Sequence, residues 1–197
     1  MDKLYDIEKA LLPLLKVFSA LNIPYYICGS VASSAYGLAR TTQDVDVVSA
    51  MNSSSSFMFC ELLKADYFLD LDAVIEAIEK RQSFNLIHLK SMIKIDVFVM
   101  RGDEYHISTF ERIRKDSLSE HDTSEKINFS SPEDTILSKL QWFRESGETS
   151  EKQWLDITGV LKVQNKLLDF ELLRTWASRL GLEGLLKKAI EDSGIAS

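Results

Sequence analysis

The segment 25–48 constrains the fold of this chain more than any other stretch. It begins with a short apolar run, turns at Gly29-Ser30, continues through small residues that suit a short helix, and ends in Asp44-Val-Asp46-Val-Val. Strand side chains alternate between faces, so Asp44 and Asp46 point the same way from positions roughly 6.5 Å apart. Two like charges on one face repel each other, and a divalent cation between them relieves the repulsion. The segment therefore predicts a metal-dependent enzyme.

The spacing of apolar residues elsewhere predicts strands and helices of ordinary length. Serine and aspartate at the starts of several apolar runs are typical helix N-caps, namely Ser131, Ser150 and Asp169. The predicted strands are 25–28, 44–48, 84–89 and 92–99, the last two forming a hairpin. The predicted helices are 4–21, 31–36, 57–63, 72–80, 132–144, 150–162, 169–180 and 182–191.

This order of elements predicts an α/β (α+β) fold, a mixed sheet flanked by helices and followed by a helical lobe. We expect the sheet-bearing lobe to span residues 1–115 and the helical lobe residues 132–197. The segment 116–131 is polar and poor in core-forming residues, which favours a linker between the two lobes.

Composition narrows the class of protein. The 197 residues carry 45% hydrophobic side chains, enough for a substantial core. A net charge of −7 argues against a general nucleic-acid coat protein, which needs clustered Lys and Arg. The two cysteines do not suggest a disulfide framework, and neither a secretory leader nor a membrane span is recognisable. We expect a cytoplasmic protein that does not associate with a membrane.

A third carboxylate, Asp96, lies within the apolar strand 92–99. Burying an ionised carboxylate costs several kcal/mol unless it is paired or binds a metal. Lys94 shares the strand face of Asp96, so a partly exposed ion pair is the alternative to a metal ligand.

Taken together, these motifs resemble the signature of the DNA polymerase β-like nucleotidyltransferase superfamily. The pieces are Cys28-Gly29-Ser30, a 13-residue spacer, Asp44-Val-Asp46-Val, and later Ile-Asp96-Val. The end of the spacer, residues 35–43, is also similar to the segment before the Asp pair in small bacterial nucleotidyltransferase-like proteins, including toxin components of the abortive-infection type.

The resemblance implies a division of roles among these residues. Asp44 and Asp46 would hold Mg²⁺ or Mn²⁺ on the triphosphate, and Asp96 would complete a second metal site and help deprotonate the attacking hydroxyl. Gly29 would let the backbone approach the phosphates, next to the amides that begin the following helix, and Ser30 would add a hydroxyl donor. Without the aspartates, Gly29-Ser30 would be an ordinary strand-to-helix turn.

Two basic residues complete the predicted nucleotide site. The helix 132–144 resembles a helix of the small bacterial relatives in which a Lys contacts the triphosphate, and Lys139 takes that place here. Lys139 could equally be a solvated lysine at the edge of the core. Asp156 would either orient Lys139 or pair with a local Arg, and Arg40 would bind phosphate or acceptor, or remain an exposed loop residue.

The predicted function is therefore metal-dependent transfer of a nucleoside monophosphate from an NTP such as ATP to a hydroxyl, with release of pyrophosphate. The acceptor would be RNA or tRNA, a protein or a small molecule. One alternative keeps the fold without catalysis, as a binding or regulatory protein in a toxin–antitoxin pair with a protein partner. A second alternative is metal-dependent phosphodiester hydrolysis by the same acids.

Overall fold

The chain divides into two compact units, and each is described by itself. The computed structural model describes residues 3–38, 42, 44–117 and 126–195. Unit 1 comprises residues 1–28 and 41–129, and unit 2 comprises residues 29–40 and 130–197. The polypeptide therefore passes from one unit to the other three times. The two lobes expected from the sequence were contiguous, whereas unit 2 also takes in the short helix that follows the first strand.

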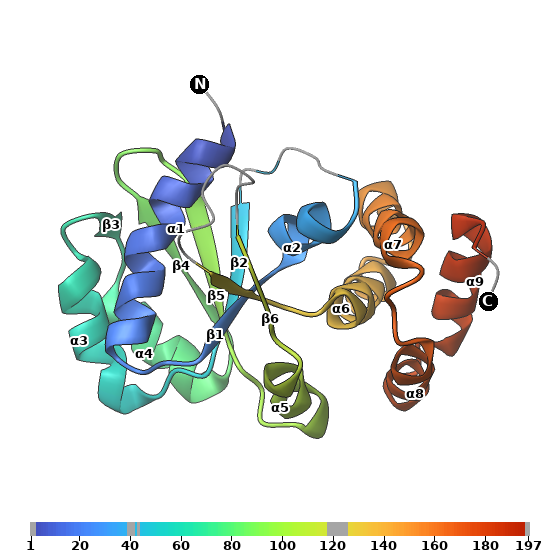
Figure 1. Cartoon of the computed structure of the whole chain (residues 1–197). Helices are drawn as coiled ribbons and strands as arrows, with labels where there is room; N and C mark the ends of the chain where they lie inside the picture. The colour runs from blue at the N-terminus through green and yellow to red at the C-terminus, as the bar shows by residue number, and fades with distance from the viewer. Residues whose placement is uncertain (1–2, 39–41, 43, 118–125, 196–197) are drawn as a thin grey trace. The chain divides into compact units, whose positions relative to one another are not determined.

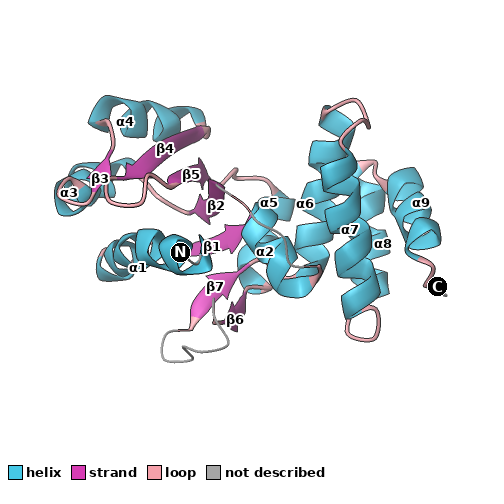
Figure 2. Cartoon of the chain, turned by 90° about the horizontal axis from the view of Figure 1, so that it is seen from above, coloured by secondary structure: helices cyan, strands magenta, loops and turns pink. Residues whose placement is uncertain are grey.

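Unit 1 is built on a mixed sheet. Within the described residues, seven strands form the sheet in the order β3-β4-β5-β2-β1-β7-β6, which Figure 2 shows from one edge to the other. The central strands are β1 (Tyr25–Cys28), β2 (Asp44–Ser49), β4 (Ser83–His88) and β5 (Lys94–Val99). β2 is antiparallel to β1 and parallel to β5, and β4 is antiparallel to β5. These pairings confirm the predicted strands and the predicted hairpin.

One face of this sheet forms the core of unit 1. Alternate residues of β2 and β5 are completely buried there, namely Val45, Val47, Ile95 and Val97. Three helices accompany the sheet (Figure 1): α1 (Lys3–Ala20), α3 (Ser53–Leu63) and α4 (Leu71–Lys80). α1 packs on α3, and α3 packs on α4.

Aromatic side chains join these helices to the buried face. The ring of Phe59 in α3 lies 5.4 Å from that of Phe18 in α1 and 6.0 Å from that of Phe84 in β4. Phe84 pairs in register with Val97, so its side chain lies on the buried face. The helices α1 and α3 therefore cover this face, and residues one position along each strand point to the opposite face.

Short edge elements were not predicted. β3 (Tyr67–Phe68) pairs with β4, and the other edge is formed by β6 (Arg114–Asp116) and β7 (Ile127–Phe129). The two ends of the expected linker 116–131 thus belong to the sheet, because β7 pairs with β1 and β6 pairs with β7. The helix α5 (Glu104–Glu111) was also missed. The inner part of the expected linker, 118–125, lies outside the described residues.

Unit 2 is helical. It contains α2 (Gly29–Tyr36), α6 (Pro132–Glu145), α7 (Glu151–Gln164), α8 (Phe170–Leu180) and α9 (Glu183–Ser193). The side chains of Ser131, Ser150 and Asp169 accept hydrogen bonds from backbone amides three residues later, which confirms three N-caps expected from the sequence.

The helix α2 packs closely against α6 and α7. A Cβ atom on Gly37, just after α2, would lie 2.9 Å from the backbone nitrogen of Val160 and 3.0 Å from the carbonyl oxygen of Ser33. Gln164 also donates a hydrogen bond to the carbonyl of Tyr36. The absence of a side chain at Gly37 therefore permits the close approach of the two backbones.

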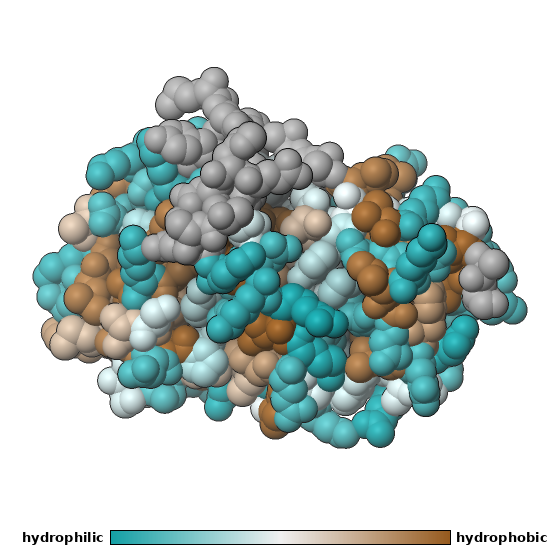
Figure 3. All heavy atoms as spheres, in the orientation of Figure 1, coloured by the Kyte–Doolittle hydropathy of each residue, from teal (hydrophilic) through white to brown (hydrophobic). Residues whose placement is uncertain are grey.

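The surface is mixed in character. On the face drawn in Figure 3, hydrophobic and hydrophilic residues alternate in small groups. In the part of the chain that the structure describes, no helix combines the length and the apolar character that a membrane crossing requires.

Candidate functional site

The three predicted catalytic aspartates lie on one face of the sheet in unit 1. Asp46 of β2 pairs directly with Asp96 of β5, and Asp44 pairs with Lys94. Paired residues on neighbouring strands point to the same face, and their strands are about 4.8 Å apart. Asp44 and Asp46 share that face because they are two residues apart. The structure thus brings the three carboxylates to neighbouring positions, on the face opposite to the buried valines.

The local sequence explains this arrangement. In both strands each acidic residue is followed by a completely buried apolar residue: Val45 and Val47 in β2, Val97 in β5. A shift of one residue in either strand would bury carboxylates in the core and expose the valines, which is strongly unfavourable. The register therefore holds Asp46 beside Asp96.

Lys94 joins the acidic group. Its ammonium nitrogen lies 2.8 Å from Oδ1 and 2.9 Å from Oδ2 of Asp96, with side chains 45% and 21% exposed, respectively. The hydrogen bond to Asp96 raises the pKa of Lys94 above its ordinary value, and the charges of Asp96, Asp44 and Asp46 act in the same direction against a smaller opposing effect of burial. The ion pair that the sequence offered as an alternative is therefore present.

The chemistry of the group fits a hard divalent cation, because it offers carboxylate oxygens and already attracts a positive charge. Among the side chains that the structure describes, however, no three of His, Cys, Asp or Glu are gathered so as to hold a metal ion. Asp96 is instead bonded to Lys94. Asp44, Asp46 and Asp96 are the residues that would hold a cation, and Lys94 lies against Asp96 in this structure.

Two further residues extend the row of Asp46 and Asp96 across the sheet. Cys28 of β1 pairs with Asp46, and Asn85 of β4 pairs with Asp96. The sequence analysis did not single out Asn85. The pattern that could have identified Asn85 is the alternation in β4, where this exposed polar residue separates the buried Phe84 and Leu86. That Asn85 lies beside Asp96 could be known only from the register of the hairpin.

Gly29 and Ser30 begin α2 of unit 2. Gly29 has a φ of 61°, a conformation that glycine adopts without steric cost. The carbonyl of Ser30 accepts a hydrogen bond from the hydroxyl of Ser33 within the first turn. The predicted change from strand to helix is thus made at a glycine in the left-handed conformation. Arg40 lies outside the described residues.

Lys139 lies in the interior of unit 2. Its ammonium donates hydrogen bonds to Oδ2 of Asp156 at 2.8 Å and to Oε1 of Gln153 at 3.0 Å. The Lys139 and Asp156 side chains are only 3% and 4% exposed. The sequence suggested that Asp156 orients Lys139 or pairs with an arginine, and in the structure Asp156 bonds Lys139. A solvated Lys139 is not what the structure shows.

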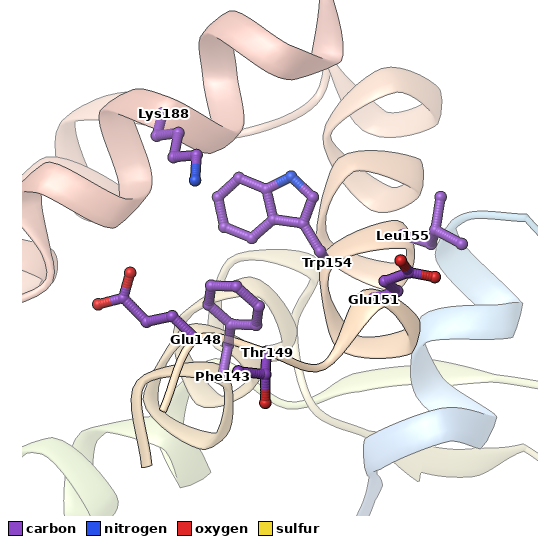
Figure 4. A pocket seen from close by; sticks show the side chains of 7 residues that line it. All are labelled: Phe143, Glu148, Thr149, Glu151, Trp154, Leu155 and Lys188. Atoms are coloured by element: carbon purple, nitrogen blue, oxygen red, sulfur yellow. The ribbon is translucent and has the colours of Figure 1, made fainter. Parts of the chain in front are cut away.

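A hollow of about 320 Å³ lies elsewhere in unit 2 (Figure 4). The rings of Phe143 and Trp154 lie 4.8 Å apart in it, and the ammonium of Lys188 lies 5.1 Å from the centre of the Trp154 ring. Glu148 and Glu151 add negative charge to the lining. Of the residues predicted for catalysis or nucleotide binding that the structure describes, none lines this hollow.

Comparisons with known proteins support the fold. No protein-family model matches the chain, and no curated protein matches its sequence. Solved structures do match. The lincomycin-bound lincosamide antibiotic adenylyltransferase LnuA is 14% identical, covering 79% of this chain and 97% of that one, with a TM-score of 0.50. The antibiotic-resistance factor ANT(2'')-Ia is 13% identical, covering 92% and 95%, with a TM-score of 0.55.

A third similar structure is an antigenic nucleotidyltransferase-like protein from Paracoccidioides brasiliensis. It is 18% identical, covering 93% of this chain and 91% of that one, with a TM-score of 0.51. These matches extend over most of each chain and thus include both the sheet and the helices. The chain therefore has the nucleotidyltransferase fold, as its sequence motifs predicted.

Proposed function

We propose that this protein is a metal-dependent nucleotidyltransferase. It transfers a nucleoside monophosphate from an NTP to a hydroxyl group and releases pyrophosphate. The observation that carries the proposal is the pairing of Asp46 with Asp96 on adjacent parallel strands, with Asp44 on the same face, in a chain of nucleotidyltransferase fold. In this reaction the acceptor oxygen forms a bond to the α-phosphorus, and the bond from that phosphorus to the oxygen bridging to the β-phosphate breaks.

Each carboxylate has a distinct role in the proposal. Asp44 and Asp46 would bind Mg²⁺ or Mn²⁺ on the triphosphate, and Asp96 would complete a second metal site. When bound, the cations neutralise charge on the phosphates and on the entering and leaving oxygens. Asp96 also accepts the proton that the acceptor hydroxyl loses as it attacks.

Four residues bind the nucleotide in this proposal: Gly29, Ser30, Arg40 and Lys139. The first amides of α2 offer hydrogen-bond donors and a partial positive charge to phosphate, and the conformation of Gly29 supports this turn. Lys139 supplies a positive charge to the triphosphate, for which its ammonium turns from its present partners Asp156 and Gln153. Arg40 is proposed from the sequence alone.

The acceptor carries a hydroxyl group, and we propose a small molecule in preference to RNA or protein. A net charge of −7 weakens attraction to the phosphates of RNA. Two of the similar structures hold small molecules, lincomycin in LnuA and adenylyl-2''-tobramycin in ANT(2'')-Ia.

The proposal is tested by incubating the protein with each of the four α-³²P-labelled NTPs and Mg²⁺ or Mn²⁺. Separate reactions would contain lincosamide and aminoglycoside antibiotics, total RNA, or cell protein. We expect label to move to one acceptor class and pyrophosphate to appear in equal amount. Asp46→Asn should abolish transfer, whereas Asp66→Asn should not, because Asp66 lies between α3 and β3 rather than in the row of Asp46 and Asp96.

A non-catalytic regulatory protein of the same fold is a second candidate, with a protein partner such as the other member of a toxin–antitoxin pair. The observation that favours it is the ion pair between Lys94 and Asp96, which already neutralises one of the three carboxylates. Thermal melts distinguish the two candidates, since a ligand that binds only the native state raises the melting midpoint. Under this second candidate, Mg²⁺ with NTP would leave the melting midpoint unchanged in both the wild type and Asp46→Asn.

A further inference from the structure

The ion pair between Lys94 and Asp96 occupies the group of carboxylates proposed to bind the cation. Lys94 lies opposite Asp44 in register, and Asp96 lies opposite Asp46. The four charged residues therefore form a compact patch of two rows on one face of β2 and β5. Both oxygens of Asp96 lie within hydrogen-bond distance of the Lys94 ammonium.

An ammonium and a divalent cation compete for a carboxylate when both lie at close range. They repel each other, and each removes the negative charge that attracts the other. Lys94 stabilises the patch in the absence of a metal because it offsets the repulsion among three acids on one face.

We propose that Lys94 is a positioning residue that holds Asp96 in the metal-free protein and competes with the divalent cation for it. Cation binding then requires Asp96 to turn from Lys94 toward Asp46. The inference rests on the proposed function, because it takes Asp44, Asp46 and Asp96 as the cation ligands. It adds that the metal affinity of this chain is set partly by a residue that is not a metal ligand.

The test is Mn²⁺ binding to the full chain, measured by isothermal titration calorimetry, with the metal-free melting midpoint as a second readout. Lys94→Met should bind Mn²⁺ roughly five- to tenfold more tightly than wild type, because a partly exposed ion pair and one cation repulsion are removed. Its metal-free midpoint should fall. Lys94→Gln serves as a second neutral variant, and Lys94→Arg, which keeps the charge, should bind Mn²⁺ about as wild type does.

The matched control is Lys90→Met in the same hairpin. Lys90 is 82% exposed and lies 3.8 Å from Asp66, so its removal should leave Mn²⁺ affinity unchanged. Equal Mn²⁺ affinity in wild type and both neutral variants would overturn the role of Lys94 while leaving the proposed function intact. Weaker binding by the neutral variants would also overturn it, because Lys94 would then be building the site. Binding that Asp46→Asn does not weaken would instead refute the metal site of the proposed function.

Discussion

The buried pair of Lys139 and Asp156 offers a sharp test of how unit 2 is held together. The perturbation is Lys139→Met, which keeps the length of the side chain and removes its charge. Asp156 would then remain as a carboxylate in the interior without the ammonium that now lies 2.8 Å from it. Removal of one member of a buried ion pair is among the most destabilising changes a mutation can make.

The expected magnitude follows from the burial. Both side chains are less than 5% exposed, so solvent does not screen the loss. Breaking such a pair costs about 3–5 kcal/mol, whereas replacing both members with apolar residues is often close to neutral. We therefore expect Lys139→Met to lose most of that amount and Lys139→Met with Asp156→Leu to recover much of it. Both variants also remove the hydrogen bond from Lys139 to Gln153, which limits the recovery.

The assay is urea unfolding followed by tryptophan fluorescence. All three tryptophans of the chain, Trp142, Trp154 and Trp176, belong to unit 2 and therefore report on its unfolding. With a slope of about 1–1.5 kcal/mol per M for a unit of this size, the midpoint of the single variant should fall by roughly 2 M or more. A matched control is Lys187→Met, whose side chain is 80% exposed and pairs with Glu191 at 4.0 Å, and which should leave the midpoint unchanged.

A single variant that loses less than about 1 kcal/mol, or a double variant no more stable than the single one, would refute this account of the pair. The double variant also tests the proposed nucleotide site. Once folded, it should bind NTP more weakly than wild type if Lys139 contacts the triphosphate. Unchanged NTP affinity would assign Lys139 a purely structural role.

Three further predictions concern single positions. Gly37→Ala should destabilise the chain by about 1–3 kcal/mol in urea unfolding, because the new Cβ would lie 2.9 Å from the backbone of α7. The control Gly184→Ala, with open space around the new Cβ, should be neutral or slightly stabilising. Burial lowers the pKa of His88 below its ordinary 6.5, so the unfolded chain binds a proton at this imidazole more readily than the folded chain does. The free energy of unfolding should therefore decrease as the pH falls below about 6.5, and it should decrease less steeply in His88→Gln. The same pH dependence in both proteins would contradict this. Burial raises the pKa of Cys60 to about 11, so at pH 8 roughly one thiol in a thousand is ionised; mass spectrometry should find Cys60 alkylated far more slowly by iodoacetamide in the native protein than in urea.

Local patterns sufficed to predict the main strands and helices. The alternation around Asp44 and Asp46 identified the strand and its polar face, and capping residues such as Ser150 and Asp169 marked where helices begin. Periodicity could not find β3, β6 or β7, because strands of two or three residues are too short to show it. Only their pairing with neighbouring strands defines them, and pairing is not local.

The site was predictable in its residues and less so in its contacts. That Asp44 and Asp46 share a face follows from the strand period alone. That Asp46 lies opposite Asp96 depends on a parallel pairing between strands separated by α3, β3, α4 and β4, which no local pattern specifies. The sequence offered Lys94 and a metal as alternative partners of Asp96, and the choice between them depends on side-chain geometry and on whether a cation is bound.

The repeated passage of the chain between its two units has a practical consequence for anyone who dissects the protein. Unit 2 has no single starting point, because α2 comes from residues 29–40 and the other helices come from beyond residue 129. A fragment starting at residue 130 would lack α2 and expose the sides of α6 and α7 on which it packs.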